Sequence, residues 1–181
     1  MRLRNILILL AVFLALGTVY YVSSKPEPAP PPEPQLYVWM VEMDDLEHIK
    51  IELPREDRSQ SFIKHEDRYW YFDDPPGLRV DMARWGGGIP LLLSGPGTNR
   101  IIAENATDEK MTVFGLAQPR MEITLALTGG RTLNIPVGDS TPDGQAFYVQ
   151  APNTRDVALV DYTWFQVLER LVKDPPYPPA E

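Results

Sequence analysis

Cysteine is absent from this chain, and histidine occurs only twice in its 181 residues. Without cysteine there is no disulfide scaffold, no zinc-thiolate site, no thiol catalysis and no lipid-modified N-terminal cysteine. Basic residues are also scarce. Removing Arg2 and Arg4 from the 17 Lys and Arg leaves 15 against 25 Asp and Glu, a net charge of −10 for residues 25–181. This acidity argues against a nucleic-acid partner, since affinity for nucleic acid depends on neutralising phosphates.

One long apolar run lies near the N-terminus, at residues 6–22, behind the two arginines. A helix of that length spans about 25 Å, near the short end of what crosses a hydrocarbon core. We therefore expect residues 1–24 to form a transmembrane anchor in the inner or plasma membrane. The arginines place its N-terminus in the cytoplasm and the rest of the chain outside it. A removed signal peptide is the alternative, because residues 15–17 and 22–24 both resemble cleavage sites.

Proline is abundant, with 19 residues, and it gathers in two segments. Residues 25–35 (KPEPAPPPEPQ) predict an extended spacer of roughly 30 Å, because proline fixes φ and removes a backbone donor. Residues 174–181 (DPPYPPAE) predict a disordered tail. The extracytoplasmic domain is then expected at residues 36–173.

Within residues 36–173 apolar and polar residues alternate over short runs that Gly, Pro, Asn and Asp separate. This period of two predicts an α+β fold with antiparallel sheets. Four strands followed by a helix are expected twice, at 37–93 and 121–172. We therefore predict two sequential four-strand-plus-helix units, a degenerate duplication, preceded by one transmembrane helix. In the last helix, Thr163 and Gln166 have the spacing of a capping box.

No set of residues predicts catalysis or cofactor binding, so a non-enzyme is expected. His48 and His65 would bind a metal only if two strands brought them together, and alternation places His48 on the solvent side. Residues 138–144 (GDSTPDG) offer the calcium-ligand types Asp139, Ser140 and Asp143, but they lack a closing glutamate and predict a turn. The three glycines at 86–88 lack the Lys-Ser/Thr of a phosphate loop.

Aromatic side chains form the one candidate interaction surface. Residues 69–72 read Tyr-Trp-Tyr-Phe, and Trp39 is a further aromatic. Alternate residues of a strand point to opposite sides, so part of this set is expected in the core and part at the surface. The predicted surface consists of Trp39, Tyr69, Trp70 and Tyr71.

From Phe114 onward the sequence carries a family resemblance. FGLAQPRMEITLAL precedes a glycine turn, and LNIPVGD, FYVQ and VALVD follow. This pattern resembles the domain-of-unknown-function 4340 family over residues 36–172, most strongly at 114–161. The matching residues are Gly115, Leu116, Pro119, Gly138, Tyr148 and Val149.

The resemblance implies a bacterial membrane-anchored protein, similar to proteins encoded beside transporter subunits of the gliding-motility type. We therefore expect a membrane-tethered, non-enzymatic interaction or accessory domain of a bacterial envelope complex. Its expected partners are the membrane, through residues 6–22, and envelope proteins such as an ABC-type transporter. The alternative is an extracytoplasmic ligand-binding module that uses the aromatic face.

Overall fold

The computed structural model describes residues 3–23, 35–86, 88–98 and 100–179. The chain divides into two units, Met1–Pro34 and Gln35–Glu181. In the first unit, helix α1 spans Leu3–Ser23, and Leu9, Phe13 and Leu16 are among its exposed side chains, Phe13 to 78%. No helix among the described residues has the length and apolarity that a membrane crossing requires, which contradicts the predicted transmembrane helix. Of the predicted spacer, only Gln35 lies within the described residues.

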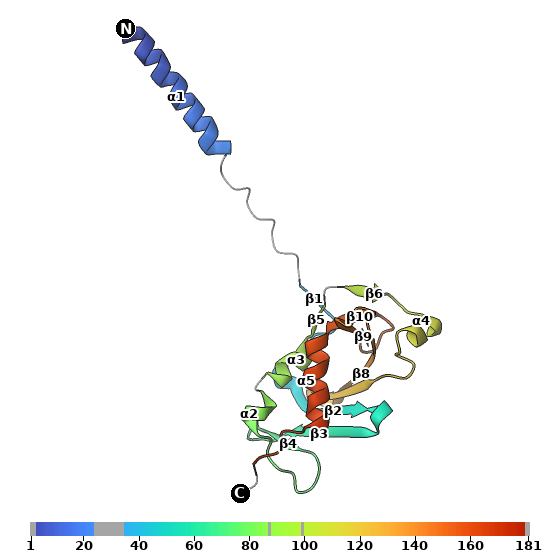
Figure 1. Cartoon of the computed structure of the whole chain (residues 1–181). Coiled ribbons are helices and arrows are strands. Elements are labelled where there is room, and N and C mark those ends of the chain that lie inside the picture. The colour runs from blue at the N-terminus through green and yellow to red at the C-terminus, as the bar shows by residue number, and fades with distance from the viewer. Residues whose placement is uncertain (1–2, 24–34, 87, 99, 180–181) are drawn as a thin grey trace. The chain divides into compact units, whose positions relative to one another are not determined.

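The second unit consists of short strands and helices (Figure 1). Its strands are β1 (Leu36–Tyr37), β2 (Leu46–Leu53), β3 (Arg58–Lys64), β4 (Trp70–Phe72), β5 (Gly97–Thr98), β6 (Ile101–Ala103), β7 (Met121–Leu127), β8 (Arg131–Ser140), β9 (Ala146–Gln150) and β10 (Val157–Asp161). Its helices are α2 (Met82–Trp85), α3 (Ile89–Ser94), α4 (Asp108–Val113) and α5 (Tyr162–Lys173), with single 3₁₀ turns at η1 (Met43–Asp45), η2 (Pro54–Glu56) and η3 (Thr128–Gly130).

Eight strands form one antiparallel sheet in the order β4-β3-β2-β7-β8-β9-β10-β6, and β1 and β5 form a separate pair. Strands β7 and β8 form a hairpin. Gly129 and Gly130 turn it with φ of +77° and +75°, a region that glycine enters without a Cβ clash. Strand β6 pairs with β10 at the far edge of the sheet, although the two are distant in sequence.

This single sheet corrects the prediction of two four-strand-plus-helix units. The first half contributes only β2, β3 and β4 next to one another, and β2 pairs with β7 of the second half from Leu46↔Leu127 to Glu52↔Glu122. The physical reason is edge pairing. Separate units would leave the backbone groups of β2 and β7 unpaired, and each unit would bury too small a core.

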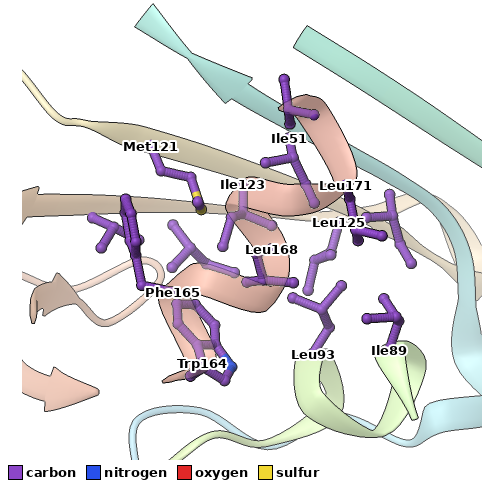
Figure 2. Packing of buried hydrophobic residues seen from close by; sticks show 14 of the residues in the cluster. Ile51, Ile89, Leu93, Met121, Ile123, Leu125, Trp164, Phe165, Leu168 and Leu171 are labelled. Atoms are coloured by element: carbon purple, nitrogen blue, oxygen red, sulfur yellow. The ribbon is translucent and has the colours of Figure 1, made fainter. Parts of the chain in front are cut away.

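The main core lies between one face of the sheet and the helices (Figure 2). Helix α5 packs across β2, β3, β9 and β10. Its buried side chains are Trp164, Phe165, Leu168, Leu171 and Val172. From α3, Ile89 and Leu93 enter the same core, as does Trp85 from α2.

A smaller core lies on the opposite face, beneath α4. Ala158 and Val160 of β10 join the main core, whereas Val157 joins Met111 of α4 in the second cluster. Neighbouring residues of a strand point to opposite faces, so β10 is covered on both sides. The Phe114 ring stacks on Tyr148 in this second cluster, with centroids 4.5 Å apart.

Residues 174–177 of the segment predicted as a tail contact the domain, and residues 180–181 lie outside the described residues. Pro176 is buried, and its carbonyl accepts a hydrogen bond from the Asp81 amide at 2.9 Å. The Tyr177 ring stacks on Phe72. Apolar burial and ring stacking therefore order this segment, despite its proline-rich composition.

Candidate functional site

An apolar groove of about 620 Å³ opens between α3 and the start of α5. The segment 37–40 forms one wall, residues 94–97 form part of another, and the end of β10 and the first turns of α5 close it. Its lining residues are Tyr37, Met40, Leu91, Leu92, Ser94, Gly95, Pro96, Gly97, Val160, Asp161, Thr163, Trp164 and Val167.

Two tryptophan side chains hold the elements that form this groove in place. The Trp39 indole N–H donates to the Leu93 carbonyl at 2.9 Å, and the Trp164 indole N–H donates to the Leu92 carbonyl at 3.0 Å. The two rings meet edge to face, with centroids 6.1 Å apart. Because both donors are satisfied by the last turn of α3, they hold that turn against α5.

The wall of residues 37–41 is fixed by backbone pairing with the segment after α3. The Val38 amide donates to the Pro96 carbonyl at 3.1 Å, and the Val41 amide donates to the Ser94 carbonyl at 2.7 Å. Only the short strand β1 (Leu36–Tyr37) forms in this part of the chain. These two hydrogen bonds hold residues 37–41, called the strap below, against the end of α3.

The rim of the groove is apolar and unusually exposed. Met40 is 73% exposed, Leu91 65% and Tyr37 45%. The polar groups nearby are engaged elsewhere: the Asp161 carboxylate accepts from the Thr163 amide at 2.7 Å and caps α5. Hydrogen bonds from the Thr163 hydroxyl and amide lower the pKa of Asp161. Such a groove can bind an apolar surface.

The predicted aromatic surface is divided between core and exterior. Trp39 and Trp70 are 7% and 5% exposed and belong to the main core, so neither side chain forms part of the surface. Tyr69 lies under the Arg79 guanidinium at 3.5 Å, and the Tyr71 hydroxyl donates to the Asp67 carboxylate at 2.7 Å. Only Tyr69 and Tyr71 therefore remain as candidates from that set.

Met40 and Leu91, the most exposed residues of the groove, were not among the predicted site residues. A usable signal exists for Leu91, a large apolar residue in a segment that Gly and Pro interrupt, whereas residues 35–53 around Met40 contain neither Gly nor Pro. The sequence does not show that the two segments lie together, since their contact depends on the strap.

The two histidines line a second groove, of about 440 Å³, over β2 and β3. His48 Nε2 lies 2.9 Å from an Asp73 carboxylate oxygen, and the His65 ring stacks on Tyr71 with centroids 4.2 Å apart. Among the described residues, no three metal-ligating side chains gather in one place. Each histidine thus has a protein partner of its own.

The acidic residues of the 138–144 segment also have protein partners. Asp139 accepts from Arg55 Nη1 at 2.8 Å and from Arg120 Nε at 3.0 Å. Partial burial alone would raise the pKa of Asp139, but the hydrogen bonds from Arg120 and Arg55 outweigh it and lower that pKa. Asp143 accepts from the Thr141 hydroxyl, which lowers its pKa, and from the Gln145 amide at 3.1 Å. Residues 138–140 form the end of β8, so the turn predicted at 138–144 is confined to the residues between β8 and β9, where Asp143 accepts its hydrogen bonds.

Residues 94–174 match the family model described as Domain of unknown function (DUF4340). The matched segment runs from the end of α3 to the end of α5. The resemblance seen in the sequence is confirmed over this segment, which includes residues 114–161. No curated protein and no solved structure matches the chain.

Proposed function

We propose that this chain is a non-enzymatic interaction module of a bacterial envelope complex, in which the groove between α3 and α5 binds an apolar segment of a partner protein. The observation that carries this proposal is the exposed apolar rim, with Met40 at 73% and Leu91 at 65%. Burying one such side chain contributes about 1.5–3 kcal/mol. Contiguous exposed apolar surface on a soluble domain is typical of a protein contact.

The shape of the groove favours an apolar helix or strand as the bound element. Helix-in-groove recognition uses apolar anchors that enter a preformed cleft, and the two tryptophan hydrogen bonds preform this one. A transporter subunit of the gliding-motility type is the first partner to test, because of the family resemblance. This assignment remains part of the proposal.

We also propose that residues 6–22 hold the protein at the membrane, with the domain on the extracytoplasmic side. Within the described residues of α1, Leu9 is 63% exposed, Phe13 78% and Leu16 64%. Exposed large apolar side chains on one helix favour contact with lipid or with another protein. A basic start before an apolar run is also typical of segments that direct export.

The groove is tested by co-purification after chemical cross-linking in mild detergent. Met40→Glu and Leu91→Glu place a charge on the rim, and we expect each to abolish capture of the partner that the parent chain retains. Both positions are exposed, so the free energy of unfolding should change by no more than about 0.5 kcal/mol. Ile101→Glu is the matched control, because Ile101 is 47% exposed on β6, outside the groove lining.

Recovery of the parent chain alone under several gentle conditions contradicts the interaction proposal. Equal capture by the parent and both rim variants moves the interface away from the groove. For the membrane proposal, deletion of residues 1–24 should release the domain into the soluble fraction. If that shortened chain stays with membranes through salt and carbonate washes, residues 6–22 are not what holds it there.

A further inference from the structure

A second surface, formed by β4 and the start of α2, is covered by residues of the chain itself. Residues 174–177 (Asp-Pro-Pro-Tyr) run along β4 and α2 after the end of α5 (Figure 1). They contact the domain at three chemically different points. The structure therefore shows this surface with a bound segment, and the sequence of that segment is known.

The first contact is ionic and the second is a backbone hydrogen bond. The Arg84 guanidinium donates to the Asp174 carboxylate at 2.6 Å. The Asp81 amide, at the start of α2, donates to the Pro176 carbonyl at 2.9 Å. The surface thus offers a cation for an acidic residue and a main-chain donor for a proline carbonyl two positions later.

The third contact is aromatic. The Tyr177 ring stacks on Phe72 with centroids 4.2 Å apart and an angle of 15° between the planes. Phe72 itself is only 2% exposed, because Tyr177 and the core cover both of its sides. The Tyr177 amide also donates to the Pro175 carbonyl at 2.8 Å, which closes a γ-turn and aims the ring at Phe72.

These contacts hold the segment lightly. Asp174 is 71% exposed in its ion pair and Tyr177 is 40% exposed, so solvent reaches two of the three contacts. Exposed ion pairs contribute little, and a segment with few buried contacts opens locally while the rest of the domain stays folded. The occupant can therefore exchange without unfolding of the sheet.

We propose that Phe72, Asp81 and Arg84 form a binding site for proline-rich peptides in which an acidic residue is followed by two prolines and an aromatic residue. Residues 174–177 fill this site in cis and must leave before a peptide of another protein enters. The prolines make such a peptide stiff, so binding loses little conformational entropy. This site is independent of the groove between α3 and α5, and its use does not require that groove.

The test is fluorescence polarisation with a labelled peptide of residues 174–181, added to the full chain in detergent micelles. The parent chain should show no saturable binding below about 100 µM, because a tethered competitor has an effective concentration of about 1 mM. Tyr177→Ala removes the ring contact of the cis segment, and we expect peptide affinity to rise by about tenfold. Tyr177→Phe keeps the ring and should behave as the parent.

Two controls define the specificity. A peptide of residues 25–35, which is proline-rich and acidic but has no aromatic residue, should not bind Tyr177→Ala. Adding Arg84→Glu to Tyr177→Ala should abolish binding of the 174–181 peptide, since it reverses the charge that meets Asp174. A chain that ends at Lys173 should bind the 174–181 peptide most tightly.

The proposal is overturned if Tyr177→Ala, with native near-ultraviolet circular dichroism, binds the 174–181 peptide no better than the parent. Equal binding of the 25–35 peptide, or binding that survives Arg84→Glu, also overturns it. If the chain that ends at Lys173 does not fold, Tyr177→Ala with its Phe control decides the question alone.

Discussion

At the scale of single residues, the loop of residues 114–119 shows why two glycines of the family pattern occur where they do. The Asp139 amide of β8 donates to the Phe114 carbonyl at 2.9 Å, so the loop lies directly on the strand. A Cβ on Gly138 would overlap the Phe114 carbonyl oxygen, and one on Gly115 would overlap the Asp139 carboxylate. The close approach of two backbones therefore requires glycine at both positions.

Gly138→Ala should destabilise the domain by about 3 kcal/mol, because the backbone of the loop must move away from β8. Gly129→Ala is the matched control. Gly129 has a φ of +77° but no atom within 4 Å of its added Cβ, so only backbone strain of about 1–2 kcal/mol is expected. Urea unfolding of both variants measures the difference. Equal midpoints for the two would show that the loop does not lie against β8 in solution.

Asp139 joins the same loop to η2, because its carboxylate binds both Arg55 and Arg120. Arg55 also donates to the Gln118 carbonyl through Nε at 3.1 Å and through Nη2 at 2.6 Å. One arginine thus holds the loop and the carboxylate together. Partial burial raises the pKa of Asp139, but the hydrogen bonds from both arginines lower it by more. In the native state this pKa therefore lies below its usual value of 3.8.

The lowered pKa predicts a pH dependence of stability. The native state binds fewer protons than the unfolded state below about pH 4, so this stabilisation is present above that pH. It is lost as the pH falls through the native pKa. Asp139→Asn should therefore flatten the fall in thermal midpoint between about pH 4 and pH 2. An Asp139→Asn curve parallel to that of the parent would contradict the ion pair.

At the scale of elements, α5 shows how local signals and packing combine. The amphipathic face of residues 162–173 predicts this helix, and its apolar residues enter the core (Figure 2). The predicted cap at Thr163 is wrong by two positions. Asp161 caps the helix and accepts from the Thr163 amide, while Gln166 Nε2 donates to the Tyr162 hydroxyl at 3.0 Å. A carboxylate at the end of β10 is the better acceptor there.

Leu168→Ala should destabilise the domain by about 2–5 kcal/mol, because Leu168 is fully buried between α5 and the sheet. Gln166→Ala on the exposed side of the same helix should change the free energy of unfolding by no more than about 0.5 kcal/mol. Chemical denaturation followed by tryptophan fluorescence reports both values. A midpoint for Leu168→Ala that coincides with that of Gln166→Ala would mean that α5 does not pack on the sheet.

Helix α4 confirms its sequence signals. Thr107 is its N-cap and accepts from the Lys110 amide at 3.4 Å, Asp108 and Glu109 lie in its first turn, and Gly115 follows its end with a φ of +72°. The short strands depart from their signals more often. Residues 37–43 (YVWMVEM) form an almost continuous apolar run of the kind found in buried strands, yet β1 covers only Leu36–Tyr37. Whether such a run forms a strand depends on the neighbouring strand with which it can pair.

At the scale of the whole domain, the two halves of the sequence depend on each other. The β2–β7 pairing joins the halves in the middle of the sheet, and β6 of the first half pairs with β10 of the second. Helix α5 of the second half also covers β2 and β3 of the first half. Neither half retains a complete core by itself.

Cutting the domain between Glu104 and Asn105 should therefore give two fragments that are unfolded alone and fold when mixed. Fragments of fewer than about 80 residues seldom have a core that supplies more than 3–5 kcal/mol, and here each core is also divided. Circular dichroism and amide proton dispersion, recorded before and after mixing, measure this. Native-like dispersion in either isolated fragment would restore the model of two independent units.

Much of the local architecture follows from the sequence alone. Alternation predicts β2, β3, β7, β8, β9 and β10, since a half-buried strand needs apolar residues at every second position. Glycine and capping residues predict the β7–β8 turn and α4 because their effects act within a few residues. The family resemblance follows from the same local features, since its glycines mark a turn and a close backbone approach.

Only the tertiary structure decided which strands are neighbours and which apolar residues stay exposed. The pairing of β2 with β7 and of β6 with β10 is a contact across the chain, and no local pattern encodes it. Met40 and Leu91 form one rim because the strap of residues 37–41 binds the end of α3, while Trp39, the residue before Met40, turns into the core. Burial depends on all surrounding elements at once, whereas sequence periodicity reports one element at a time.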